Sequence, residues 1–274
     1  MSAADESLQR LEQLLRGYDA LAVAVSGGVD SLTLATVAHR ALGARAHMYH
    51  AVSPAVPAEA TQRVRDFAAR EGWTLSVVEA GEFADADYRS NPVNRCFYCK
   101  TNLYGTLSPL TSAQIVAGTN LDDLGEYRPG LDAAANHGVR HPFVEAGIDK
   151  KTVRAIAREL GLGDVADLPA APCLSSRIET GIAIDPAMLG LVHAAERLVA
   201  GKLQPGTVRC RVRARGVVIE LDEPHLAALD APARQAIEGE IGALFREGGF
   251  EYPVSLAPYR TGSAFLVRLQ RSAA

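Results

Sequence analysis

The chain of 274 residues carries a formal net charge of −4, and 48% of its residues are hydrophobic and 22% charged. This composition is typical of a globular protein and excludes a disordered or fibrous chain. No apolar run approaches the ~20 residues that a membrane helix needs, so we expect a cytoplasmic protein without a membrane partner. The acidic balance disfavours a large nucleic-acid surface, and no nucleic-acid partner is expected.

The first half of the chain alternates short apolar runs with amphipathic segments. After an amphipathic helix at the amino terminus, the pattern predicts strands and helices at Leu21–Val25, Ser31–Leu42, Ala44–Val52, Ala58–Glu71, Thr74–Val78 and Gln114–Gly118. Strands that alternate with helices build a parallel sheet, whose ligand sites lie in the loops beyond the carboxyl ends of the strands. Those loops are therefore where we expect the chemistry.

The second half begins with a helix near Asp149 and a proline-containing loop over residues 167–181, where the periodic pattern stops. Beyond this loop the predicted elements are Pro186–Ala200 (helix), Thr207–Arg215 and Val217–Leu221 (strands) and Pro232–Phe245 (helix). We therefore predict an α/β protein with two domains. A parallel-sheet domain covers residues 1–181, and a smaller α/β domain covers residues 182–274.

The segment SGGVDS, from Ser26 to Ser31, follows the first predicted strand and runs into a helix. Gly27 and Gly28 allow backbone amides to approach an anion, and the helix amino terminus adds unpaired N–H groups and a favourable dipole. The two serine hydroxyls can donate to the same phosphate oxygens. Asp30 would repel phosphate and is predicted to bind a Mg²⁺ ion that bridges the phosphates. An ordinary glycine turn is the alternative.

SGGVDS resembles the pyrophosphate loop (PP-loop) of the N-type ATP pyrophosphatases, which include NAD synthetase and GMP synthetase. The resemblance implies an adenine nucleotide alpha hydrolase-like fold, and cleavage of ATP between its α and β phosphates. The acidic segment GTNLDDLGEYRPG, residues 118–130, is similar to a loop of the same enzymes. Asp122, Asp123 and Glu126 are candidate Mg²⁺ ligands, and Arg128 could neutralise pyrophosphate. An acidic solvated loop is the alternative.

Three of the four cysteines form a second candidate site. Cys96 and Cys99 stand as CxxC in NRCFYCK, predicted to be a long loop, and Cys173 lies in another loop. Cytoplasmic thiols stay reduced, so metal binding or catalysis is favoured over disulfides. Three thiolates can hold an iron–sulfur cubane that leaves one iron open to sulfide. Zinc, with His137 or His141 as a further ligand, and inert buried thiols are the alternatives.

Six segments resemble, in order, those of the LarE family: SGGVDS, NRCFYCKTNLY, GTNLDDLGEYRPG, PCLSSRI, RVRARG with IE after it, and PYRTGS. Together they span nearly the whole chain. The resemblance implies a pyridinium-3,5-bisthiocarboxylic acid mononucleotide synthase, which adenylates a carboxylate of a pyridinium mononucleotide with ATP and then replaces the activated oxygen with sulfur. It acts in biosynthesis of the nickel-pincer cofactor of lactate racemase. The expected ligands are ATP, Mg²⁺ and this small-molecule substrate, and a homo-oligomer is the expected assembly.

The cysteine count distinguishes two sulfur routes within that family. Members with only the PCLxSR-type cysteine sacrifice its sulfur and are left with dehydroalanine. Members that also carry the CxxC resemble an enzyme in which three thiolates hold a 4Fe-4S cluster, whose free iron carries the transferred sulfide. On this resemblance Cys96, Cys99 and Cys173 are the expected cluster ligands, and a sacrificial Cys173 is the alternative. Cys210 fits neither route and is predicted to be a buried thiol.

Arg209, Arg211, Arg213 and Arg215 share one parity in TVRCRVRAR, so on a strand they would project from one face. Guanidiniums on one face repel one another unless anions lie nearby, although a solvated face is the alternative. The resemblance implies a phosphate-binding patch for the mononucleotide made by Arg211, Arg213 and Glu220.

The residues beside Cys173 are further candidates. Ser176 and Arg177 are suited to position the substrate carboxylate. Glu196 is a weaker candidate, and we expect it at the surface of its helix. The competing functions are a tRNA thiolase, which the net charge of −4 disfavours, an amide-forming ligase similar to NAD synthetase, and a nucleotide sensor without catalysis.

Overall fold

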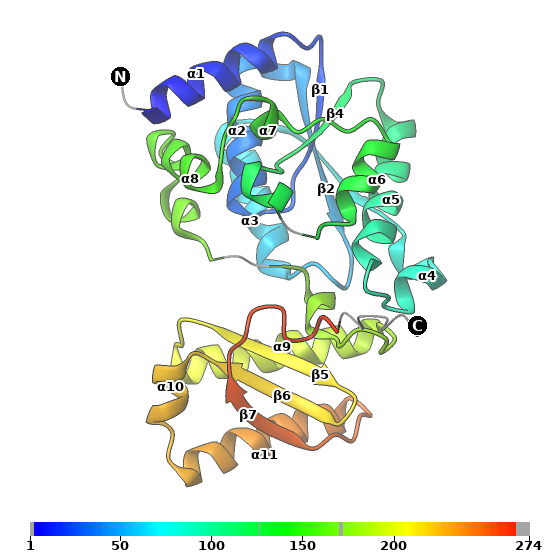
Figure 1. The fold of residues 1–274 in the computed structure, drawn as a ribbon, viewed down its shortest axis with the longest axis vertical. Helices are drawn as coiled ribbons and strands as arrows, with labels where there is room; N and C mark the ends of the chain where they lie inside the picture. The colour runs from blue at the N-terminus through cyan, green and yellow to red at the C-terminus, as the bar shows by residue number, and fades with distance from the viewer. Residues whose placement is uncertain (1–2, 126, 170–171, 267–274) are drawn as a thin grey trace, which may run out of the picture. The chain divides into compact units, whose positions relative to one another are not determined.

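The computed structural model describes residues 3–125, 127–169 and 172–266 (Figure 1). The chain forms two compact units, one comprising residues 1–84 and 96–171 and the other residues 85–95 and 172–274. The sequence-based boundary between residues 181 and 182 stays a prediction. Within the described ranges, no helix is long and apolar enough to cross a membrane.

The first unit contains a four-stranded parallel sheet with the strand order β3-β2-β1-β4. Its strands are β1 (Leu21–Ala24), β2 (Ala46–Val52), β3 (Thr74–Glu79) and β4 (Gln114–Ala117). The helices around it are α1 (Ala3–Arg16), α2 (Val29–Leu42), α3 (Ala58–Glu71), α5 (Arg95–Leu107), α6 (Gly130–Asn136), α7 (Pro142–Glu145) and α8 (Lys150–Glu159). This arrangement confirms the predicted α/β class with a parallel sheet of the PP-loop type.

Alternate residues of β1 enter two separate apolar clusters. Leu21 and Val23 pack in a cluster with residues of α1, α2, α3 and α8, whereas Ala22 packs in a cluster with residues of α5 and α6. Because successive side chains of a strand point to opposite faces, helices cover both faces of the sheet, as Figure 1 shows. The predicted site segment Ser26 to Ser31 follows the carboxyl end of β1.

Cys96 and Cys99 lie in the first turns of helix α5, so the prediction that they lie in a loop is wrong. The buried residues that hold this helix to the sheet, Leu103, Tyr104 and Leu107, come late in it. The early turns lack buried apolar residues, and helical periodicity is therefore not visible around the CxxC.

The second unit has a three-stranded sheet in the order β5-β6-β7, with β5 and β6 antiparallel and β6 and β7 parallel. Its elements are α4 (Ala86–Arg89), α9 (Pro186–Leu203), β5 (Val208–Arg213), β6 (Gly216–Leu221), α10 (Glu223–Ala228), α11 (Ala231–Glu247) and β7 (Val254–Pro258). Helix α9 packs on β5 and α11 on β7. Strand β7 has no counterpart among the predicted elements.

Strand β5 ends at Arg213, so the prediction that it runs to Arg215 is wrong. Arg213 pairs with Gly216, which leaves Ala214 and Arg215 as the hairpin turn. Gly216 has φ 142°, and a side chain there would collide with Pro253. Arg215 is therefore an exposed turn residue, outside the row of strand arginines.

Candidate functional site

The predicted phosphate loop, Ser26 to Ser31, lies between β1 and α2 and is closed by its own serines. The Ser31 hydroxyl donates to the Gly28 carbonyl at 3.1 Å and accepts from the Ser26 backbone N–H, also at 3.1 Å. Gly27 has φ 84°, and a Cβ there would lie 2.7 Å from the Ala60 carbonyl oxygen. The backbone therefore needs glycine at this position, and the loop leads directly into the amino terminus of the 14-residue helix α2.

Asp30, in the first turn of α2, is held by two residues from distant parts of the chain. Lys150 Nζ lies 2.5 Å from Asp30 Oδ2, and Asn120 Nδ2 donates to Oδ1 at 3.2 Å. Both charged side chains remain partly exposed, at 26% for Asp30 and 31% for Lys150. The predicted phosphate loop contains no lysine of its own, but Lys150 lies beside its Asp30. Sequence reasoning missed Lys150, whose only local signal is its place after the helix cap Asp149.

The acidic segment after β4 brings two predicted residues together. Arg128 Nη2 lies 2.7 Å from Asp123 Oδ1, and Asp123 Oδ2 accepts the Asn120 backbone N–H at 3.1 Å. Asp122 accepts the backbone N–H of Lys150 at 3.2 Å. Glu126, the third predicted carboxylate, lies outside the described residues. This segment and Asp30 are therefore linked through Asn120 and Lys150, at the carboxyl ends of β1 and β4.

The cysteines differ in burial. Cys96 and Cys99 stand at i and i+3 of α5, a spacing that puts both thiols on one helical face, and both are partly exposed. Cys173 is partly exposed and precedes the 3₁₀ turn Leu174–Arg177 of the second unit. Cys210 is buried in β5, as predicted, and burial raises the pKa of its thiol. None of the four forms a disulfide.

No group of three or more His, Cys, Asp or Glu that could hold a metal ion is found within residues 3–125, 127–169 and 172–266.

The segment that precedes the CxxC is bonded to the segment that follows Cys173. Asn91 Nδ2 donates to the carbonyl oxygens of Glu179 and Ile182, at 2.9 Å each, and the Asn91 carbonyl accepts the Gly181 N–H at 2.9 Å. The Asn91 side-chain oxygen accepts from Arg95 Nη1 at 2.5 Å. Asn91 is fully buried with φ 55°, a conformation that asparagine tolerates better than most residues. Arg95, the residue before Cys96, is thus bonded to Asn91, which is in turn bonded to the segment after Cys173.

Arg177 and Glu196 form a buried ion pair, and the expectation that Glu196 lies at the surface is wrong. Arg177 Nε lies 2.9 Å from Glu196 Oε1 and Nη2 lies 3.1 Å from Oε2, while Oε1 also accepts the Cys210 backbone N–H at 3.0 Å. Nη1 of the same arginine donates to the Pro172 carbonyl at 2.6 Å and to Ser176 Oγ at 3.0 Å. The pair therefore fixes the turn that carries Cys173.

The anion that balances the strand arginines is Glu220 of β6. Its carboxylate lies 2.9 Å from Arg211 Nε and 2.7 Å from Arg213 Nη2, and it accepts from Ser263 Oγ at 2.7 Å. Arg211 and Glu220 are buried, and Arg213 is 30% exposed. The three residues of the predicted patch, Arg211, Arg213 and Glu220, are therefore brought together. Arg211 and Glu220 already neutralise one another as a buried ion pair.

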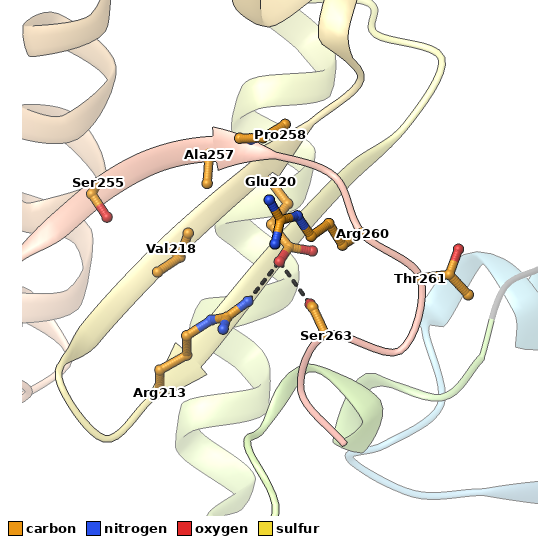
Figure 2. A pocket seen from close by; sticks show the side chains of 9 residues that line it. All are labelled: Arg213, Val218, Glu220, Ser255, Ala257, Pro258, Arg260, Thr261 and Ser263. Atoms are coloured by element: carbon orange, nitrogen blue, oxygen red, sulfur yellow. Dashed lines mark hydrogen bonds and ion pairs between the residues drawn. The ribbon is translucent and has the colours of Figure 1, made fainter. Parts of the chain in front are cut away.

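A cavity of about 520 Å³ opens beside this cluster, lined by Arg213, Val218, Glu220, Ser255, Ala257, Pro258, Arg260, Thr261 and Ser263. Figure 2 shows Arg213 and Arg260 among the residues that line this cavity together with Glu220. Two guanidiniums against one carboxylate leave the lining with an excess of positive charge. Sequence periodicity assigns no place to Arg260 or Ser263, because they follow β7, the strand that the pattern does not reveal.

Comparison with known proteins gives three relatives. An uncharacterized protein of Synechocystis sp. is 36% identical over 270 residues, which cover 94% of this chain and 96% of that protein. The pyridinium-3,5-bisthiocarboxylic acid mononucleotide synthase of Lactiplantibacillus plantarum is 29% identical over 218 residues, 77% of this chain and 78% of that enzyme. An uncharacterized protein of Methanocaldococcus jannaschii is 31% identical over 137 residues, 48% of this chain and 53% of that protein.

No protein-family model matches the chain. The Synechocystis protein is similar over almost the full length of both chains, and the L. plantarum synthase is similar over more than three quarters of both. The chain therefore belongs to the same family as the Synechocystis protein, and its similarity to the L. plantarum synthase supports a LarE-like family.

Proposed function

We propose that the protein is an ATP-dependent sulfur transferase of nickel-pincer cofactor biosynthesis. It would adenylate a carboxylate of a pyridinium dicarboxylate mononucleotide and replace an oxygen of that group with sulfur. The observation that carries the proposal is the phosphate loop closed by Ser26 and Ser31 and flanked by Asp30 and Lys150, in a chain similar to the L. plantarum synthase. The cavity of the second unit, which Arg213 and Arg260 line, is proposed to bind the mononucleotide.

In the adenylation step, ATP binds with its phosphates against the loop amides and the hydroxyls of Ser26 and Ser31. Asp30 and Asp123 would hold Mg²⁺, which supplies positive charge against the phosphate oxygens. A carboxylate oxygen of the substrate attacks the α-phosphorus, the bond from that phosphorus to the bridging oxygen breaks, and pyrophosphate leaves. Lys150 and Arg128 offer cationic partners for the departing pyrophosphate.

In the sulfur-transfer step, a sulfide sulfur attacks the acyl carbon and the bond from that carbon to the AMP oxygen breaks. AMP departs, and the substrate then carries a thiocarboxylate. No change of oxidation state is needed. We propose Cys96, Cys99 and Cys173 as ligands of a 4Fe-4S cluster, which when bound offers an iron that can carry sulfide. The support is the shared helical face of the CxxC thiols, and the bonding of Asn91, close to Cys96 in the chain, to the segment after Cys173.

The alternative sulfur route uses Cys173 alone. Its thiolate would displace AMP from the acyl carbon, giving a thioester. Removal of the Cα proton and cleavage of the Cβ–S bond would then leave dehydroalanine in the chain and the thiocarboxylate on the substrate. The partial exposure of Cys173 is compatible with both routes.

For substrate binding, we propose that Arg213 contacts the mononucleotide phosphate, while Arg211 and Glu220 orient it through the ion pairs described above. Ser176 and Arg177 are proposed to face the substrate carboxylate. Arg177 already donates to Glu196, Pro172 and Ser176, so its proposed contribution includes holding the turn of Cys173 in place.

The proposal is tested with anaerobically purified protein, ATP, Mg²⁺, sulfide and the pyridinium dicarboxylate mononucleotide. We expect AMP, pyrophosphate and a product whose mass shows oxygen replaced by sulfur. AMP formation that yields an amide with ammonia, or no AMP with any carboxylate acceptor, would contradict it.

A further inference from the structure

Arg63, in helix α3, is a cation at the predicted phosphate loop that has no part in the mechanism proposed above. Its Nη1 atom donates to the carbonyl oxygen of Gly27, the second residue of the loop, at 2.8 Å. Within the described residues, the guanidinium has neither a carboxylate at ion-pair distance nor a second hydrogen-bond partner. The side chain is only partly buried. Its Nε and Nη2 atoms therefore remain able to donate to a ligand.

Helix α3, which carries this arginine, is fixed against the loop by further contacts. His50 of β2 is buried, and its Nδ1 atom donates to the carbonyl oxygen of Val25, directly before the loop, at 2.8 Å. Burial lowers the pKa of His50, so the ring is neutral near pH 7, and Nε2 accepts from the Thr61 hydroxyl at 2.9 Å. A Cβ on Gly27 would lie 2.7 Å from the carbonyl oxygen of Ala60. The amino-terminal part of α3 is thus held in place beside the loop.

The charge of Arg63 is not offset in the way that the charge of Lys150 is. Lys150 Nζ lies 2.5 Å from Asp30 Oδ2, so this pair brings little net charge to the loop. Arg63 adds a positive charge that contacts the loop backbone itself. A guanidinium is well suited to phosphate, because its planar fork of N–H donors can bind two phosphate oxygens at once. A phosphate bound to the loop amides would therefore meet a cation on the α3 side of the loop.

We propose that Arg63 binds the β and γ phosphates of the nucleotide in the loop and stabilises them as they leave as pyrophosphate. The inference rests on the proposed use of ATP, and it adds a residue of α3 to the cations named above. Negative charge develops on the departing pyrophosphate as its bond to the α-phosphorus breaks, so a cation fixed there favours the transition state as well as binding. AMP lacks both phosphates, so Arg63 should contribute little to the binding of AMP.

The test measures the dissociation constants of inorganic pyrophosphate and of AMP, each with Mg²⁺, for the full-length parent and its variants. In Arg63→Gln the pyrophosphate constant should rise about 10-fold or more, because a charged hydrogen bond is lost, while the AMP constant stays within about 2-fold. Arg63→Lys keeps the charge without the fork and should recover part of that loss. Arg65→Gln, which removes an exposed charge from the same helix, is the matched control and should leave both constants unchanged.

Chemical modification of the parent protein tests the same contact without a variant, should Arg63→Gln fail to fold. Pyrophosphate with Mg²⁺ should protect Arg63 from phenylglyoxal, an arginine-specific reagent, whereas AMP should not. The exposed Arg65 should react equally in all samples, as peptide mass analysis can show.

Equal weakening of AMP and pyrophosphate in Arg63→Gln would show that the arginine only braces the Gly27 carbonyl, and would overturn the inference. Unchanged pyrophosphate affinity in this variant, or modification of Arg63 that pyrophosphate does not slow, would overturn it too, while leaving the proposed function intact. A parent protein that binds neither ATP nor pyrophosphate would instead overturn the proposed use of ATP, and this inference with it.

Discussion

The side-chain amide of Asn91 lies 2.9 Å from the carbonyl oxygen of Glu179, and this contact ties the segment before the CxxC to the segment after Cys173. The same amide reaches Ile182, and Arg95 donates to its oxygen. Asn91 is fully buried at φ 55°, a backbone conformation that costs free energy in a residue other than glycine. Its side chain and its carbonyl oxygen make hydrogen bonds with Glu179, Ile182, Arg95 and Gly181. These bonds fix the segment of residues 85–95 within the second unit.

Asn91→Ala should therefore lower both stability and iron loading. Removal of the amide leaves buried carbonyls and the Arg95 guanidinium without a partner, and we expect a loss of about 1–3 kcal/mol in the free energy of unfolding. The measurement is urea denaturation together with iron analysis after anaerobic reconstitution. Ser90→Ala, which removes an exposed hydroxyl that donates to Asp87, is the matched control. Full iron content in folded Asn91→Ala would contradict the positioning role.

Asp30→Ala should abolish adenylation. Asp30 is the carboxylate at the start of α2 that can hold Mg²⁺ beside the phosphate loop, and we expect AMP and pyrophosphate release to fall by about 10²-fold or more. Lys150→Met should weaken pyrophosphate binding while leaving Asp30 available to Mg²⁺. Asp66→Asn, at an exposed carboxylate of α3, should have no effect on AMP release. Parent-level AMP release by Asp30→Ala would show that the metal is held elsewhere.

Cys173→Ala should separate the two half-reactions. Adenylation needs only the phosphate loop and the acceptor, so AMP formation should persist, whereas thiocarboxylate formation should stop. Intact mass before and after turnover distinguishes the sulfur routes, because a sacrificed cysteine loses the mass of H₂S. Cys210→Ala changes a buried thiol of the same unit and should retain sulfur transfer. Undiminished thiolation by Cys173→Ala would refute both proposed roles of this residue.

Glu196→Gln should destabilise the second unit. It leaves the Arg177 guanidinium buried without a counter-charge, which costs about 3–5 kcal/mol for a buried pair. The double variant Arg177→Met, Glu196→Leu should recover much of that loss, since neither charge is then buried alone. Urea unfolding of the parent, of Glu196→Gln and of the double variant measures these losses. A cost below about 1 kcal/mol for Glu196→Gln would show that solvent reaches the pair.

Asp222 should make the free energy of unfolding depend on pH in the acid range. A hydrogen bond from His225, followed by the Thr207 backbone N–H, lowers the pKa of Asp222 from 3.8 to about 2. A carboxylate with a depressed folded-state pKa stabilises the fold above its unfolded value, and the contribution is lost as the pH falls from about 4 to about 2. The difference in urea midpoint between the parent and Asp222→Asn should therefore shrink across this pH range. A constant difference from pH 5 to pH 2 would contradict the assignment.

Local patterns predicted the elements whose signals are contained in short windows. Helix α3 has the bounds Ala58–Glu71 in both prediction and structure, because its apolar residues recur on one face and glycine follows its end. The candidate phosphate loop was recognisable since its glycines and serines fall within the six residues from Ser26 to Ser31. Helix α5 was missed because its buried residues lie beyond the cysteines, and β7 because its half-buried pattern resembles a loop.

The sequence by itself determined the parallel-sheet class, and it indicated the candidate phosphate loop and the candidate thiols, all of which follow from residue type and spacing over a few positions. Only the tertiary structure decided that Lys150 meets Asp30, that Glu220 neutralises Arg211 and Arg213, and that Asn91 binds the segment after Cys173. These partners meet because strands and helices pack in a particular order. Periodicity describes which face of an element is apolar, and it carries no information about which distant side chain lies opposite.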